Sequence, residues 1–256
     1  MNNALQQSQN FTNTLQAAGV KAFYDEMTRV HIVERGPVTY IARGPDCADL
    51  RNLRRINPRS ICLLNPDSPS PDALHRVGFH QLMTAASVAE IDLTQPVHAH
   101  PKWRAALRKS LTCSVQHRPF DPATDHWLLK ADRAQQRQKR YRAMPHAIAQ
   151  LWPKHDTHLL TATKDNTTVA AMLFLIHGSN ASYHIGWSDE DGRQACAHHL
   201  LLVTAIRQLR TRGIERLDLG SVDTENSAGL ARFKIRAGAS VRPLGGTWAA
   251  LPLFGQ

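Results

Sequence analysis

The sequence predicts an α/β protein built from two units that share one order of strands and helices. Apolar runs with the spacing of β-strands alternate with amphipathic runs that have the spacing of helices. The same order of elements occurs in each half of the chain, as expected for an old duplication. The length of 256 residues suits one large or two small domains, and 42% hydrophobic with 20% charged residues is typical of a folded protein.

The C-terminal half gives the clearer pattern. Two strands flank a Ser179-Asn180 turn and are expected to form an antiparallel hairpin. An amphipathic helix ends at Gly213, and a short helix after the next strand ends at Gly238. The expected elements are strands 167–178 and 181–187, helix 194–212, strand 214–220, helix 228–237, and β segments 239–245 and 246–253.

The N-terminal half repeats this order in shorter form. A basic residue precedes the glycine that ends the short helix in both copies, Arg76 before Gly78 and Arg236 before Gly238. The expected elements are strand 37–44, helix 48–56, strand 60–66, helix 71–77, and a closing strand pair at 79–83 and 88–93. We therefore expect two related units in sequence.

Several classes of protein are excluded by local features. The N-terminus lacks the basic start and apolar run of a secretory signal, and the longest apolar run, 169–176, is too short to cross a membrane and predicts a core strand. The four cysteines form no C-x-x-C, and the histidine pairs lack further ligands at suitable spacing. We expect a cytoplasmic protein without a metal site and without a transmembrane segment.

Positive charge is concentrated in the middle of the chain. The net charge is +10, and residues 102–142 hold eleven Lys or Arg against three Asp, so most of the surplus lies there. This stretch is expected to form a basic helical connector, residues 96–145, in which Arg104, Arg108 and Lys109 have helical spacing. Its cations are either a solvated face or phosphate ligands for CoA, a nucleotide-linked lipid precursor or tRNA.

Residues 212–239, RGIERLDLGSVDTENSAGLARFKIRAGA, resemble the Fem-like branch of the GNAT superfamily. The motif elements are a helix ending in Gly, a D-L-G strand end, and a G-L-x-x-F-K helix followed by Gly. Residues 159–188 look like the hairpin of this branch, and residues 76–93 followed by 102–110 look like its passage from the first to the second domain. The resemblance implies two GNAT-like units, each a mixed sheet flanked by helices, with a degenerate N-terminal unit (1–95), the connector (96–145) and a C-terminal transferase domain (146–256).

The resemblance also implies an acyltransferase that moves an acyl or aminoacyl group onto an amine of a small molecule or peptide. In the first reading the donor is acetyl-CoA or another acyl-CoA, held at a helix N-terminus by the loop that contains Arg193, Gln194, Cys196 and Ala197. In N-acetyltransferases this loop has the motif [RQ]-x-x-G-x-[GA], and in this sequence Cys196 and His198 replace its Gly and its Gly or Ala. The alternative donor is aminoacyl-tRNA, and a third reading is a non-catalytic nucleic-acid-binding protein.

Lys234, the lysine of the F-K pair, is the first candidate for catalysis, because the resemblance places it beside the reacting carbonyl as an oxyanion stabiliser. Phe233 is either core or a donor contact. A general base for the amine is either His184, since an ordinary imidazole titrates near neutral pH, or Asp218 at a strand end. The two alternatives remain open at this point.

The strand 181–187 is the one that the family uses to line the acyl channel. Strict alternation predicts Tyr183, Ile185 and Trp187 on one face, and His184 and Gly186 on the other. Tyr183 and Trp187 are candidates for donor binding, with core packing as the competing interpretation.

Overall fold

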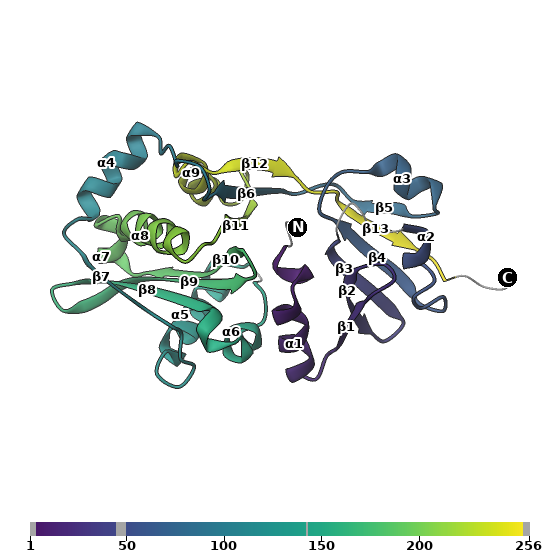
Figure 1. The fold of residues 1–256 in the computed structure, drawn as a ribbon. Helices are drawn as coiled ribbons and strands as arrows, with labels where there is room; N and C mark the ends of the chain where they lie inside the picture. Colours follow the sequence, from purple (N-terminus) through teal and green to yellow (C-terminus); the bar gives the residue numbers. More distant parts are fainter. Residues whose placement is uncertain (1–3, 45–49, 142, 253–256) are drawn as a thin grey trace. The chain divides into compact units, whose positions relative to one another are not determined.

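The computed structural model describes residues 4–44, 50–141 and 143–252. The chain forms two compact units (Figure 1). The first unit contains residues 1–88 and 241–256, and the second unit contains residues 89–240.

The first unit is a six-stranded mixed sheet with short helices. Its sheet order is β1-β2-β3-β4-β13-β5, with β3 and β4 parallel and the other neighbouring strands antiparallel. Its elements are η1 (Leu5–Gln7), α1 (Gln9–Ala17), β1 (Lys21–Asp25), β2 (Val30–Arg35), β3 (Val38–Gly44), α2 (Leu50–Leu53), β4 (Ile61–Pro66), α3 (Pro71–Arg76), β5 (His80–Met83) and β13 (Thr247–Ala250).

The second unit carries a seven-stranded mixed sheet in the order β12-β6-β11-β10-β9-β8-β7, although the first residues of β6 and most of β12 lie beyond residues 89–240. Its strands are β6 (Ser87–Asp92), β7 (Ser114–Arg118), β8 (Thr157–Lys164), β9 (Thr167–His177), β10 (Asn180–Ser188), β11 (Arg216–Val222) and β12 (Ser240–Pro243). Its helices are α4 (Pro101–Ser110), α5 (His126–Lys139), α6 (Ala147–Leu151), η2 (Lys154–Asp156), α7 (Glu190–Gln194), α8 (Ala197–Thr211) and α9 (Ala228–Arg236).

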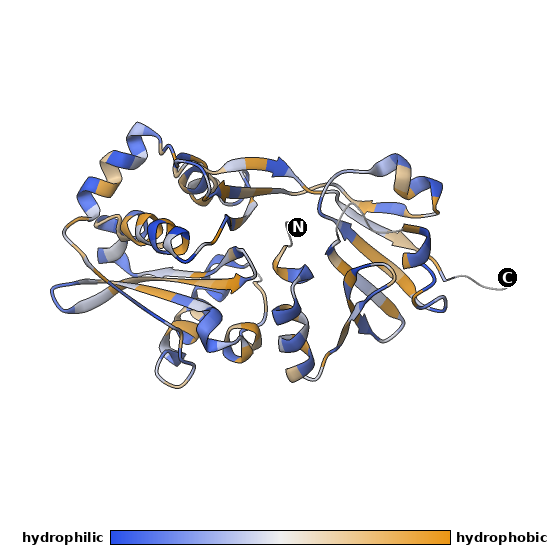
Figure 2. Ribbon diagram, viewed as in Figure 1, coloured by the Kyte–Doolittle hydropathy of each residue, from blue (hydrophilic) through white to orange (hydrophobic). Residues whose placement is uncertain are grey.

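Apolar side chains pack on both faces of this sheet, and the ribbon in Figure 2 is coloured by the hydropathy of each residue. On β9, Met172 and Phe174 belong to the cluster that includes Leu202 of α8, whereas Leu173 belongs to the cluster that includes Leu128 of α5. Because β9 is buried on both faces, its apolar run is continuous rather than alternating. The predicted core strand and the predicted hairpin around Ser179 are therefore present in the structure.

The two sheets share one order of strands. The series β1-β2-β3-β4-β13-β5 matches the series β8-β9-β10-β11-β6-β12, and the third and fourth strands are parallel in both. Strand β6 comes from the N-terminal copy of the repeat but joins the second sheet, whereas the C-terminal strand β13 joins the first. The predicted closing pair at 79–83 and 88–93 is therefore wrong, because each of these strands hydrogen-bonds in a different sheet.

The predicted connector also differs from the structure. It contains the edge strand β7, which pairs with β8, between helices α4 and α5. This strand is short and polar, so alternation gave no signal for it. The second unit extends over residues 89–240, whereas boundaries at 95 and 145 were predicted, because α4, β7 and α5 contact other elements of the second unit.

The segment between the third and fourth strands differs between the units. In the second unit it contains α7 and the 15-residue α8, whereas the described part of the first unit has the four-residue α2 there. Only the second unit therefore presents a long helix after its third strand within the residues that the structure describes.

Candidate active site

The candidate site begins where two parallel strands of the second unit separate. The ladder between β10 and β11 contains the pairs Asn180 with Arg216, Ala181 with Leu217, and Ser182 with Asp218. Both strands continue, to Ser188 and Val222, with no further ladder pair between them in the described chain. The backbone of β10 after Ser182 therefore has an edge that β11 does not cover.

A β-bulge lies at the point of separation. Tyr183 pairs with Phe174 and Ile185 pairs with Leu173, so His184 is the additional residue. Tyr183 packs on the α8 side of the sheet, whereas Ile185 packs on the α5 side. The predicted common face for these two residues is therefore wrong, because one extra residue reverses the alternation of the strand.

The ring of Tyr183 lies against the backbone of Gly186. A Cβ atom at Gly186 would be 1.5 Å from the Tyr183 hydroxyl oxygen, so only glycine leaves room for this ring. Burial raises the pKa of the Tyr183 phenol, which stays protonated. A buried hydroxyl is thus held beside the uncovered edge of β10.

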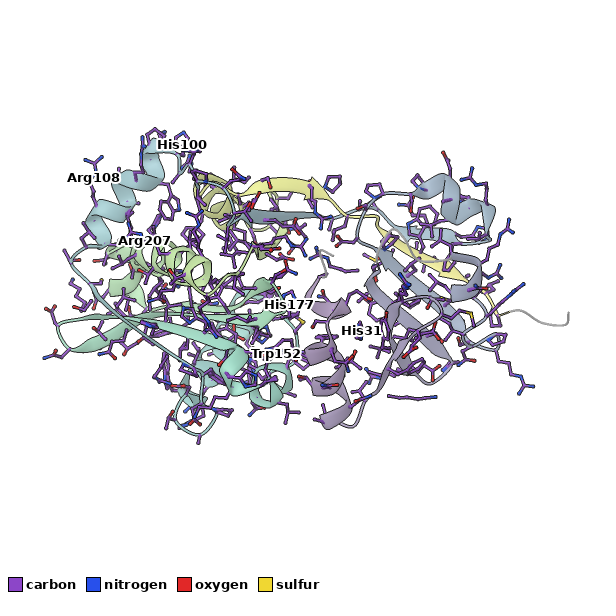
Figure 3. The ribbon with its side chains drawn as sticks, in the orientation of Figure 1. His31, His100, Arg108, Trp152, His177 and Arg207 are labelled. Atoms are coloured by element: carbon purple, nitrogen blue, oxygen red, sulfur yellow. The ribbon has the colours of Figure 1, made fainter. Side chains whose placement is uncertain are left out.

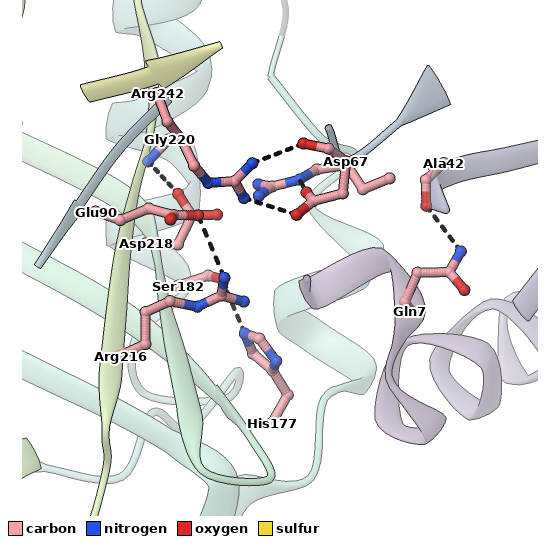
Figure 4. Close-up of polar contacts among 11 residues, drawn as sticks. Gln7, Ala42, Asp67, Glu90, His177, Ser182, Arg216, Asp218, Gly220 and Arg242 are labelled. Carbon is pink, nitrogen blue, oxygen red and sulfur yellow. Dashed lines mark hydrogen bonds and ion pairs between the residues drawn. The ribbon is translucent and has the colours of Figure 1, made fainter. Parts of the chain in front are cut away.

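Asp218, Gly220 and Lys234 meet at the C-terminal end of β11. The Asp218 carboxylate accepts a hydrogen bond from the Gly220 N–H at 2.6 Å (Figure 4). Lys234, on α9, is 4% exposed and donates from Nζ to the Ser221 carbonyl at 2.7 Å. Burial lowers the pKa of Lys234 to about 8, and the Asp218 charge partly offsets this shift.

Asp218 belongs to a row of buried polar residues on one face of the second sheet (Figure 4). Leu217 and Leu219 alternate with it and pack into the opposite core. Arg216 forms an ion pair with Glu90 at 3.5 Å, and the Ser182 hydroxyl and His177 Nε2 lie 2.9 Å apart. The strand thus presents polar groups on the face where Asp218 lies.

His184 differs from the imidazole that the sequence suggested. Burial lowers its pKa to about 4, although the Asp132 carboxylate partly counteracts this effect. The premise that His184 titrates near neutral pH is therefore wrong, because its ring is desolvated. His184 is neutral at pH 7, and its buried Nε2 has no hydrogen-bond partner in the described chain.

A buried network beside His184 escaped the sequence analysis. Asp132 of α5 is 3% exposed and accepts hydrogen bonds from His146 Nε2 at 2.8 Å and Gln136 Nε2 at 2.6 Å. Gln135 connects this region to β10 by donating to the Gly186 carbonyl at 3.1 Å. Asp132 has helical spacing from the apolar Leu128 and Leu129. Because a carboxylate on the apolar face of a helix needs hydrogen-bond partners, this spacing could have predicted the network.

The short helix α7 and the N-terminus of α8 follow β10 in the sequence. Asp189 caps α7 by accepting from the Gly192 N–H at 2.8 Å, and its own N–H donates to the Val169 carbonyl at 3.1 Å. Cys196 then adopts a left-handed conformation, with φ of 57°, directly before α8 begins at Ala197. Cysteine therefore occupies a backbone conformation that usually selects glycine.

The loop residues around Cys196 have distinct environments. The Arg193 guanidinium is exposed and forms an ion pair with Glu190 at 2.7 Å, and Gln194 donates to the same carboxylate at 3.3 Å. Ala197 is fully buried, and His198 turns inward to place Nε2 2.9 Å from the Trp187 carbonyl. The bulky His198 side chain is thus directed toward β10.

Two aromatic donor-binding candidates pack against other side chains. Phe233 lies within 5.1 Å of His199 and 6.4 Å of Trp103, measured between ring centroids. Trp187 makes an edge-on contact with Trp127 at 5.4 Å. These contacts give both rings packing roles on opposite faces of the sheet.

The predicted phosphate ligands lie on one helix. Arg104, Arg108 and Lys109 are exposed on α4, and we call them the α4 cations; Figure 3 labels Arg108. Buried Trp103 anchors the helix in the core of the second unit, and α4 contacts α8. The α4 cations are therefore available to solvent.

The described residues contain no group of three or more His, Cys, Asp or Glu that could hold a metal ion. Within the same residues, no helix is both long and apolar enough to span a membrane.

Solved structures with the same fold were found at low sequence identity. FemX is 13% identical with a TM-score of 0.74, over 98% of this chain and 93% of that one. The C-terminal domain of a putative lysylphosphatidylglycerol synthetase from Agrobacterium fabrum is 14% identical with a TM-score of 0.65, covering 96% and 88%. A tandem GNAT protein from the clavulanic acid biosynthesis pathway is 12% identical with a TM-score of 0.50, covering 87% and 79%. No curated protein matched the sequence.

The match to a family model, together with this fold, identifies the protein as a GNAT-type acyltransferase. The acetyltransferase (GNAT) domain family matches residues 104–234, which is half of the chain and lies within the second unit. The chain belongs to this family, and the resemblance to its Fem-like members is confirmed at the level of fold.

Proposed function

We propose that the protein transfers an acyl group from an acyl-CoA donor to an amine of a small molecule or peptide. The observation that carries this proposal is the left-handed Cys196 at the start of α8. A residue in this conformation lets the first helical N–H groups converge on one anion, and the helix dipole adds to the attraction.

In this proposal the donor pyrophosphate lies at the first turn of α8. Ala197 supplies a backbone N–H group, because the Cys196 N–H already donates to the Arg193 carbonyl at 3.0 Å. The exposed side chains of Arg193 and Gln194 contact the phosphates. Binding of the pyrophosphate requires Arg193 to break its ion pair with Glu190. This ion pair is exposed, so breaking it costs little free energy. The acyl arm then follows the uncovered edge of β10, between the parted strands.

Lys234 and Asp218 supply the polar groups for the transfer step. The neutral amine attacks the thioester carbonyl, and the Lys234 ammonium stabilises the oxyanion that forms. The C–S bond then breaks, the CoA thiolate leaves, and the extra amine proton passes to Asp218 or to solvent. Of the two proposed bases, Asp218 is favoured because it lies at the C-terminal end of β11, where its charge acts on Lys234.

Tyr183 lines the acyl arm in this proposal, because its ring is fixed over Gly186 on the uncovered strand. Phe233 and Trp187 support the site through packing with Trp103 and Trp127. We assign no donor site to the first unit, because α2 has four residues and the described part of that unit has no long helix after its third strand.

Aminoacyl-tRNA is the second candidate donor. The α4 cations and the other basic residues of segment 102–142 favour a phosphodiester partner. FemX and the putative lysylphosphatidylglycerol synthetase domain share the fold, although identities of 13% and 14% carry no donor from those proteins to this chain.

A thermal-shift panel tests the donor with the full chain. Acetyl-CoA, longer acyl-CoAs, charged tRNA and uncharged tRNA are compared, because a ligand of the folded state raises the melting temperature. We expect a saturable rise with acyl-CoA. A rise with charged tRNA alone would replace the acyl-CoA proposal by the aminoacyl-tRNA one, and no rise with any donor would contradict both.

A further inference from the structure

A second anion site is indicated at the β7 edge of the second sheet. A cavity of about 390 Å³ lies between β7, β8 and the C-terminal part of α8. Its lining includes His117, Arg118, His158, Arg207, Gln208 and Arg212, and no Asp or Glu. Arg207, labelled in Figure 3, is ten residues after the start of α8, which is about 15 Å along the helix axis. The cavity is therefore distinct from the proposed donor site.

A hydrogen-bond relay fixes the histidines of this cavity. His158 is 3% exposed, and its Nε2 lies 2.8 Å from the Gln208 carbonyl oxygen, which can only accept. The Gln208 amide nitrogen, 2.9 Å from His117 Nδ1, can only donate. His117 Nδ1 is therefore the acceptor, and the His117 proton is carried on Nε2. That N–H has no partner within the described chain and is available to a ligand.

The charges around the cavity favour an anion. Arg118 is neutralised by Asp125, and Arg212 donates to the His155 carbonyl at 3.0 Å. Arg207 is exposed and makes no side-chain ion pair among the described residues. Burial lowers the pKa of His158 to about 4, and the Arg212 charge pushes it in the same direction. A positive potential thus surrounds the buried ring.

We propose that this cavity binds a phosphate group. Arg207 and Arg212 offer guanidinium donors that match phosphate oxygens, and His117 Nε2–H supplies a further donor from β7. A phosphate monoester, with three free oxygens and nearly two charges, uses these donors more fully than a carboxylate does. The guanidinium and imidazole donors also fit the singly charged phosphodiester of a nucleic-acid backbone, which offers two free oxygens. The proposal does not depend on which donor the enzyme uses.

Phosphate titration of two matched double variants of the full chain tests this site. Arg207→Gln with Arg212→Gln removes two cavity cations, and Arg55→Gln with Arg59→Gln removes two exposed cations from the first unit. With inorganic phosphate in calorimetry, we expect the cavity variant to lose about tenfold or more in affinity, and the control to match the wild type. Equal phosphate affinity in the two double variants would overturn the proposal.

A second arm identifies the source of the phosphate group. An RNA stem-loop is titrated into the same proteins at fixed salt, since phosphodiester contacts depend strongly on ionic strength. A parallel loss of phosphate and RNA affinity in the cavity variant supports a nucleic-acid source. Loss of phosphate affinity with unchanged RNA affinity supports a free phosphorylated ligand.

Discussion

Replacing Lys234 by alanine tests the proposed chemistry most sharply. The ammonium is 4% exposed, lies at the end of β11 and contacts a backbone carbonyl rather than a carboxylate at short range. If it stabilises the oxyanion, Lys234→Ala lowers kcat by about 10²–10³ and changes donor affinity little, as for loss of one oxyanion donor. Lys234→Arg restores little, because a planar guanidinium does not reproduce a compact charge.

The pKa of Lys234 gives this prediction a pH signature. With the pKa lowered to about 8, the side chain is about nine-tenths protonated at pH 7 and about one-tenth at pH 9. A role that requires the ammonium therefore predicts that kcat falls as pH rises through about 8, roughly tenfold between pH 7 and pH 9. An exposed lysine would keep its charge across this range.

The assay is steady-state release of free thiol from acyl-CoA, followed across pH with a reactive amine acceptor. Arg232→Ala is the matched control, because Arg232 is an exposed cation on the same helix. Lys234→Ala should have a lower kcat, and its kcat should no longer fall as the pH rises through about 8. Arg232→Ala should keep both the wild-type kcat and its fall above pH 8. An unchanged kcat in Lys234→Ala would refute the catalytic assignment, and a raised KM with unchanged kcat would assign Lys234 to donor binding instead.

Three further predictions concern other parts of the second unit. Glutamate in place of any of the α4 cations should weaken donor or acceptor binding in a strongly salt-dependent way, and equal affinity across a salt series would count against a phosphate role. Asp132→Ala leaves the His146 and Gln136 donors without their acceptor and should lower the free energy of unfolding by about 3 kcal/mol in urea denaturation; a change below 1 kcal/mol would show that solvent replaces the contact. Gly186→Ala should cost about 1–3 kcal/mol, because its Cβ overlaps the Tyr183 ring, and a neutral result would show that the ring moves freely.

The sequence predicted local elements of the fold better than their pairing. The β9–β10 hairpin and the short helix with Lys234 follow from apolar spacing and glycine stops. The exchange of β6 and β13 between the sheets could not be predicted, because the sequence of a strand does not show which strand it will pair with. The edge strand β7 was missed because it is polar and almost fully exposed.

The candidate site shows the same limit. The D-L-G and F-K motifs led to Asp218 and Lys234, whose charges interact in the structure. The altered protonation of His184 depends on its burial in the folded chain, which the spacing of residues does not reveal. The β-bulge at His184 likewise inverts the faces of β10, because one inserted residue outweighs a correct alternation pattern.

Binding of acetyl-CoA to a charge-matched pair of variants tests the central claim most directly. Asp and Asn both tolerate the left-handed conformation of residue 196, so Cys196→Asp and Cys196→Asn differ mainly by one negative charge at the start of α8. If the donor pyrophosphate lies there, calorimetry should give near wild-type affinity for Cys196→Asn and a loss of about tenfold or more for Cys196→Asp. Equal acetyl-CoA affinity in both variants would contradict the claim that α8 holds the donor.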